Sequence, residues 1–238
     1  MSKRPPRRPP AWHDVDRLER DVVWAIDQSF APGELLPMVE RLLRLSERDS
    51  ATWGFAHRQL AELVVERQPW RAASAARQAA RVRPDDDAAH GLLGLALTVL
   101  GHYHSAAHAY RRALSLAPDN PWYAHNLGHL LDHGLGRPVQ AVPWLRQAHA
   151  ATPHPEIAAS LAHALGRVGR AAEGLVVLRR GLRGEELSTD HRALEEWLVQ
   201  GAPARLPAGL RRRAGSGSVH EAGWINRCDE RLYCWSCS

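Results

Sequence analysis

The sequence has 238 residues, of which 45% are hydrophobic and 24% are charged, as in an ordinary soluble globular chain. It contains no apolar run long enough to cross a membrane, and its first ten residues lack the apolar stretch of a secretory signal. The net charge of +5 comes from the two ends, because residues 11–200 hold 21 arginines against 23 carboxylates. We therefore expect a cytoplasmic protein without a basic folded face for nucleic acid.

The N-terminal part of the chain changes character near residue 13. Residues 1–12 combine proline with basic side chains, and we expect them to be disordered. Residues 13–28 and 34–46 show the apolar spacing of amphipathic helices. Residues 13–50 are therefore predicted to form a helix pair, which acts as a degenerate repeat or as a cap.

Proline divides the middle of the chain at a nearly constant interval. Pro84, Pro118 and Pro153 stand 34 and 35 residues apart, and each follows an amphipathic run and precedes a new helix start. The second unit holds one extra residue in its turn. Inside each unit a leucine, a small residue and a second leucine recur, as Leu93-Gly94 with Leu97, Leu127-Gly128 with Leu131, and Leu161-Ala162 with Leu165.

Together with the alanine or glycine that follows each turn, this pattern resembles the tetratricopeptide repeat over about residues 52–183. The leading tryptophan of that signature is replaced in the three units, and the third unit lacks the closing proline. The resemblance implies an all-α, right-handed solenoid of antiparallel helix pairs, with repeats over residues 51–185.

The same pattern predicts which residues form the turns and the core. Gly101, Gly136 and Gly169 lie where each pair reverses direction and a helix end needs a left-handed residue. We expect the large residues of the pattern to fill the core, namely Leu93, Leu97, Tyr110, Leu127, Leu131, Leu145, Leu161, Leu165 and Leu178.

The solenoid is predicted to end in one further helix. Ser188 begins an amphipathic stretch that carries Leu194, Trp197 and Leu198 and ends at Gly201. Residues 186–201 therefore read as the capping helix that a solenoid needs. Residues 202–218, rich in proline, glycine, arginine and serine, read as a flexible linker.

Histidines supply the candidate site. His125, His129 and His133 are spaced by four and share one face of one helix. The resemblance implies that this face lines the concave groove, where tetratricopeptide proteins commonly hold an extended peptide or a partner helix. The candidate groove residues are Trp122, His125, His129, Asp132, His133, His163 and Arg167.

Three interpretations of these histidines stay open. They bind a partner, they are solvated or structural, or an i,i+4 pair chelates a metal ion. If a ligand contacts ordinary imidazoles, its affinity should change between about pH 5.5 and 7.5. His104 and His108 form another such pair, which we expect on the outer surface.

The sequence contains no His-Glu-x-x-His, Gly-x-Ser-x-Gly or phosphate-loop motif. We therefore predict a non-enzymatic adaptor that binds a protein or peptide and has no cofactor. The alternative is a metal-binding protein or an enzyme that uses the histidine cluster or the C-terminal tail.

Residues 219–238 differ from the rest of the chain, because they hold all three cysteines and two of the nine tryptophans. One interpretation is a peptide that docks into a groove, its own or a neighbour's. A second is a zinc site, since Cys234 and Cys237 have Cys-x-x-Cys spacing and His220 and Cys228 supply two more ligands. A third is that the tail has no function. The apolar anchors for docking would be Trp224, Ile225, Leu232, Tyr233 and Trp235.

Overall fold

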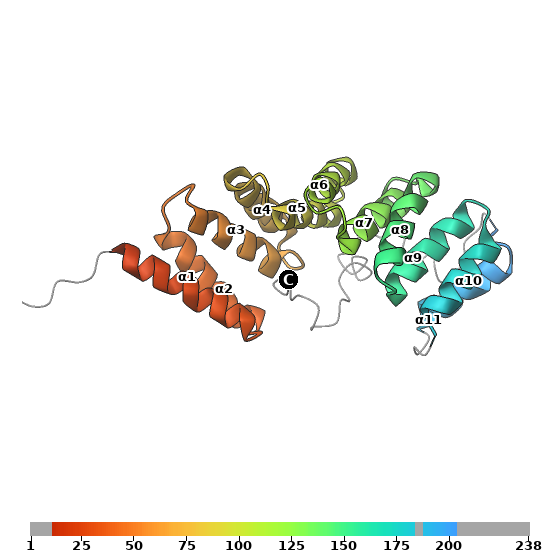
Figure 1. Cartoon of the computed structure of the whole chain (residues 1–238), viewed down its shortest axis with the longest axis horizontal. Coiled ribbons are helices and arrows are strands. Elements are labelled where there is room, and N and C mark those ends of the chain that lie inside the picture. The colour runs from red at the N-terminus through yellow and green to blue at the C-terminus, as the bar shows by residue number, and fades with distance from the viewer. Residues whose placement is uncertain (1–10, 184–187, 204–238) are drawn as a thin grey trace, which may run out of the picture.

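The computed structural model describes residues 11–183 and 188–203. Within these ranges the secondary structure is entirely helical, which confirms the predicted all-α solenoid. The helices follow one another in an arch, with α1 and α11 at its two ends (Figure 1). None of the described helices is both long and apolar enough to cross a membrane.

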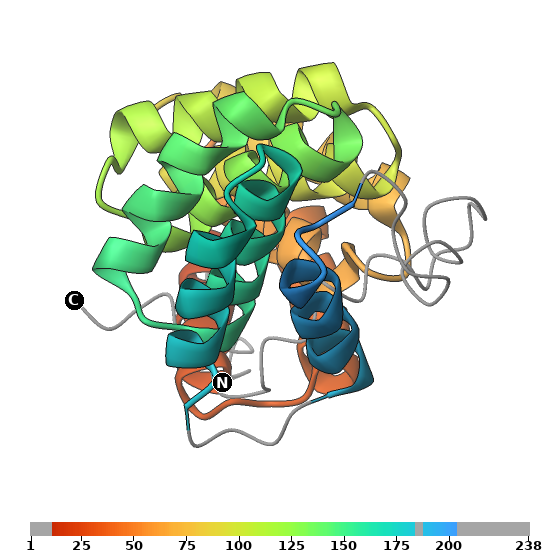
Figure 2. The ribbon, with the colours of Figure 1, turned by 90° about the vertical axis from the view of Figure 1, so that its right-hand side faces the viewer.

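The helices pack as consecutive pairs, and α11 closes the end of the stack beside α9 and α10 (Figure 2). Their bounds are α1 (Ala11–Asp27), α2 (Pro32–Leu45), α3 (Ala51–Val64), α4 (Pro69–Val82), α5 (Asp87–Val99), α6 (Tyr103–Leu116), α7 (Pro121–His129), the π-helical turn η1 (Leu130–Gly134), α8 (Pro138–Ala151), α9 (Pro155–Arg167), α10 (Ala171–Gly181) and α11 (Thr189–Val199).

The first two helices begin earlier than expected. The predicted disordered segment 1–12 is too long, because α1 already includes residues 11 and 12. Helix α2 begins at Pro32, since proline at the first helical position costs no hydrogen bond. The carboxylate of Glu34 accepts a hydrogen bond from the Ala31 amide at 3.1 Å and so satisfies an otherwise unpaired donor.

Small residues let the two helices of a pair approach closely. A Cβ placed on Gly94 would lie 2.8 Å from the Tyr110 ring, and one placed on Gly128 would lie 2.6 Å from Cγ of Leu145. The predicted turn glycines Gly101, Gly136 and Gly169 have φ of +77°, +63° and +80°, which confirms the left-handed turns.

The core changes in composition along the arch. Leucines and tyrosines fill the middle and C-terminal part, and leucine and valine pack α1 to α3, whereas every buried residue of α4 is alanine. All predicted core residues are buried except Leu93, which is only partly buried because it packs where two core clusters meet.

The last helix has the predicted start and end. The Ser188 hydroxyl accepts a hydrogen bond from the His191 amide at 3.2 Å, and Gly201 has φ of +79°. Trp197 and Leu198 are buried against Gly166 of α9 and thereby cover the open end of the last pair.

Candidate functional site

The candidate site begins at an irregular turn of helix. Helix α7 continues into the π-helical turn η1, where the Leu135 amide donates to the Leu130 carbonyl five residues earlier, at 3.0 Å. A π turn accommodates one residue more than an α turn and occurs frequently at functional sites. The extra residue of the second unit is absorbed here. As a result, Asp132 and His133, which are neighbours in sequence, both face α9.

Asp132 is fully buried and links the η1 turn to helix α9. Its Oδ1 accepts a hydrogen bond from Nη1 of Arg167 at 2.7 Å, and the same nitrogen donates to the Asp132 carbonyl at 2.6 Å. Its Oδ2 lies 2.6 Å from Nδ1 of His163 and 3.5 Å from Nδ1 of His133. Burying a carboxylate costs free energy, and hydrogen bonds and ion pairs of this kind offset that cost.

Six aromatic rings lie in a continuous row across α7, η1, α9 and α11, and we call this row the histidine ladder. Its closest members are stacked, with 4.2 Å between the ring centroids of His129 and His133 and 4.4 Å between those of His133 and His163. The other neighbours in the row lie 5.3 to 6.0 Å apart. The ladder runs Trp122, His125, His129, His133, His163 and Trp197.

Ser160 contacts the histidine ladder near its Trp122 end. Its hydroxyl lies 3.0 Å from Nε2 of His125 and 3.5 Å from Nδ1 of His129. Sequence reasoning missed this serine, and it also missed Trp197 as a member of the site. Both stand one repeat or more away along the chain, so helical spacing on α7 gave no signal for them.

Burial makes the imidazoles of His125 and His129 poor bases. It lowers the pKa of His125 to about 3, with a smaller contribution from the neighbouring His129 and His154. Burial also lowers the pKa of His129 well below the usual value, and the positive charge that His133 would carry adds to this. We therefore expect His125 and His129 to stay neutral between pH 5.5 and 7.5, in contrast to the titration expected of ordinary imidazoles in contact with a ligand.

Comparison with known proteins identifies the fold. Residues 87–120 match the family model of the tetratricopeptide repeat. PilF of Pseudomonas aeruginosa has a TM-score of 0.65 at 17% identity, covering 90% of this chain and 98% of that chain. The chain therefore has the fold of a tetratricopeptide-repeat solenoid. None of the curated protein sequences matches it significantly.

Two further tetratricopeptide-like structures resemble the chain. MamA from Desulfovibrio magneticus RS-1, residues 41 to the end, has a TM-score of 0.61 at 16% identity, covering 71% of this chain and 94% of that chain. YrrB, described as a tetratricopeptide protein with an unusual peptide-binding site, has a TM-score of 0.58 at 17% identity, covering 70% of this chain and 85% of that chain.

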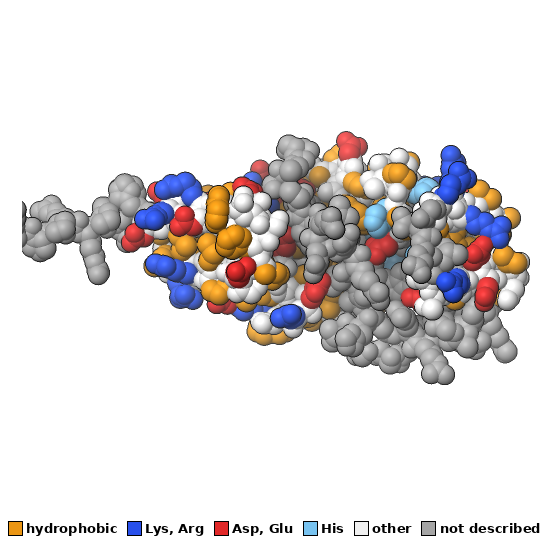
Figure 3. Space-filling view, turned by 90° about the horizontal axis from the view of Figure 1, so that it is seen from below, with side chains coloured by type: hydrophobic (Ala, Val, Ile, Leu, Met, Phe, Trp, Pro, Cys, Tyr) orange, Lys and Arg blue, Asp and Glu red, His pale blue; other side chains and the backbone are white. Residues whose placement is uncertain are grey.

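The predicted groove residues differ in how much of them a ligand could touch. His125, Asp132 and His163 are buried within the solenoid. Trp122 and His129 are half-buried, and His133 and Arg167 are exposed. Histidine side chains are visible on the underside of the arch, the face that it curves around (Figure 3). Of the predicted groove residues, Trp122, His129, His133 and Arg167 therefore expose the side-chain surface that a ligand could touch.

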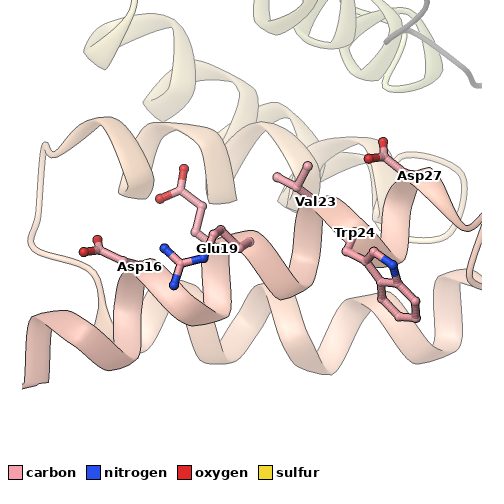
Figure 4. Close-up of a pocket in the computed structure, with 6 residues that line it drawn as sticks. Asp16, Glu19, Val23, Trp24 and Asp27 are labelled. Atoms are coloured by element: carbon pink, nitrogen blue, oxygen red, sulfur yellow. The ribbon is translucent and has the colours of Figure 1, made fainter. Parts of the chain in front are cut away.

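Other candidate residues lie away from this site. His104 and His108 are exposed on α6, as expected. The proposed tail ligands and docking anchors within residues 219–238 lie outside the described residues. A shallow depression along α1 is lined by Asp16, Glu19, Arg20, Val23, Trp24 and Asp27, which all come from this one helix (Figure 4).

Proposed function

We propose that the protein is a non-enzymatic interaction module. It holds a protein or peptide segment against the part of the histidine ladder that faces the concave side of the arch. One observation carries the proposal: a row of six rings is fixed by Asp132 and Ser160, and three of them, Trp122, His129 and His133, are partly open to solvent. A surface held in one arrangement loses little conformational entropy when a ligand binds.

The chemistry of this surface indicates the kind of segment it would take. Neutral imidazoles act as both donors and acceptors, the Trp122 ring offers an apolar face, and Arg167 supplies the one cation. Because Arg167 is already paired with Asp132, the surface has little free charge. It favours a polar segment with an aromatic or amide side chain over a strongly charged one.

The proposal assigns no catalytic step to the ladder. Asp132 is sealed from solvent, and both of its carboxylate oxygens face side chains of α9 or η1. It therefore cannot reach a substrate proton, whereas a general base must lie within hydrogen-bonding reach of the proton it removes. The peptide-binding site described for YrrB supports binding on the same fold.

Affinity purification from the source cells tests the proposal. The groove variant is Trp122→Ala with His133→Ala, because both side chains reach the surface and Trp122 is only partly buried where it packs against the core. The control is His104→Ala with His108→Ala on α6. The groove variant should lose partners that wild type and control retain, while its circular dichroism stays unchanged. An identical partner set from all three proteins would remove the groove from the functional account.

The tail is tested separately as an occupant of the groove. Truncation after residue 215 should raise the affinity for an external ligand if residues 219–238 compete for the same surface, because a tethered peptide has a high effective concentration. If the affinity for the external ligand does not change, the tail does not occupy the groove.

A further inference from the structure

The structure assigns a second property to the same part of the solenoid: Asp132, His133 and His163 form a binding site for one divalent transition-metal ion, of the Zn²⁺ or Co²⁺ type. Oδ2 of Asp132 and Nδ1 of the two histidines lie within 4.8 Å of one another. The site can be tested without a protein partner, so its failure and that of the proposed function are separate.

The ligand set fits this class of ion. Imidazole nitrogen suits zinc, cobalt and nickel, and a carboxylate oxygen completes a set of three protein ligands. Three ligands leave at least one coordination position for water or for a donor from a bound segment. His133 is exposed, so this position faces the concave surface.

The contact between His133 and Asp132 is too long for a good hydrogen bond. Oδ2 of Asp132 is 2.6 Å from Nδ1 of His163, an ordinary hydrogen bond, but 3.5 Å from Nδ1 of His133, beyond the usual N–H···O distance. Two ring nitrogens thus converge on one oxygen, and only one makes a good bond. An ion between the three atoms would satisfy all of them.

Metal binding requires one side chain to turn. The rings of His133 and His163 are stacked 4.4 Å apart at an angle of 20°, so their Nδ1 lone pairs lie in two nearly parallel planes and do not meet at one point. His133 has 44% of its side chain exposed, so it has room to rotate toward the ion. Each ring binds as a neutral ligand through Nδ1, and its proton then sits on Nε2.

Arg167 has two opposed effects on the site. Its hydrogen bonds to Oδ1 and to the Asp132 carbonyl fix the carboxylate so that Oδ2 faces the histidines. Its positive charge repels a cation. We therefore expect Arg167→Gln, which removes the charge and keeps hydrogen-bond donors, to bind metal more tightly than the wild type.

Cobalt titration of the full-length chain tests the site. Cys228, Cys234 and Cys237 are replaced by serine in all samples, because thiolates of the tail would bind the same ions. We expect one Co²⁺ per chain, with visible d–d absorption and no thiolate charge-transfer band, and displacement by Zn²⁺. His133→Gln should weaken binding by about 100-fold, since it removes one of three ligands while the buried carboxylate keeps its other partners.

The controls decide between this site and other histidines. His104→Gln with His108→Gln, and separately His220→Gln, should leave the cobalt affinity unchanged. The assignment is overturned if no saturable binding occurs, if His133→Gln binds as tightly as the parent, or if either control variant abolishes binding.

Discussion

At the scale of single residues, Asp132 holds the site together, because it pairs with side chains of α9 from a position inside the solenoid. Asp132→Ala leaves His163 buried without its acceptor and Arg167 without its counter-ion. We expect a loss of about 2–4 kcal/mol in the free energy of unfolding, measured by urea denaturation. Asp85→Ala, at an exposed carboxylate, should change it by less than about 0.5 kcal/mol.

His125 makes stability depend on pH in the acidic range. Its pKa is about 3 in the folded chain and 6.5 when the side chain is free, so between these values the unfolded state binds a proton that the folded state does not. The free energy of unfolding should therefore fall on acidification below pH 6.5, by up to about 1.4 kcal/mol per pH unit for this one proton.

The test compares unfolding free energies between about pH 4 and 7 for wild type and His125→Gln. The variant should show a slope smaller by about one proton, whereas His108→Gln on the exposed face of α6 should keep the wild-type slope. Equal slopes for wild type and His125→Gln would show that this ring titrates normally in the folded protein.

At the scale of the helix, close approach of α7 and α8 depends on Gly128. A side chain there collides with Leu145, whose Cγ would lie 2.6 Å from a new Cβ. Gly128→Leu should cost about 3 kcal/mol or more in unfolding free energy through overpacking. Gly33→Ala is the matched control, because its Cβ would meet no atom within 4 Å and alanine favours the helix of α2. Thermal denaturation should therefore show a lower Tm for the first and an equal or higher Tm for the second.

The sequence predicted the helix pairs well because the proline interval, the small residues and the turn glycines are local signals. It placed Trp122, the histidines of α7 and η1, His163 and Arg167 on one side of the solenoid for the same reason. It could not predict the π turn, since the interval of 35 residues between Pro118 and Pro153 is compatible with a longer loop as well as a wider helix.

The sequence pattern also could not predict how deeply the site residues are buried. His125 and Asp132 stand at positions that spacing alone assigns to a solvent-facing groove, yet both are buried. Their burial depends on Ser160, His163 and Arg167 of the following repeat, and only the packing of α9 onto α7 brings these residues close. The low pKa of His125 follows mainly from that burial, with a smaller contribution from His129 and His154.

At the scale of the whole molecule, the solenoid should unfold first at the end whose covering side chain is removed. Trp197 of α11 is 2% exposed and lies against Gly166 and the ring of His163. Trp197→Ala should cost about 3–5 kcal/mol locally, because it opens the last repeat. Hydrogen exchange should then quicken in α9, α10 and α11 while α3 and α4 keep their protection.

Trp70→Ala provides the comparison, since this ring on α4 is 66% exposed and fills no core space. Its exchange pattern should match that of the wild type. Uniform acceleration along the whole chain in Trp197→Ala would mean that the solenoid unfolds as a single cooperative unit.

The alanine core of α4 makes this helix intolerant of larger side chains. Its buried alanines let α4 lie close against α3 and α5. A longer side chain at Ala76, which is fully buried, would push these helices apart. Because the curvature of a solenoid follows from the small rotation at each repeat, such a wedge would also change the bend of the arch on which the histidine ladder lies.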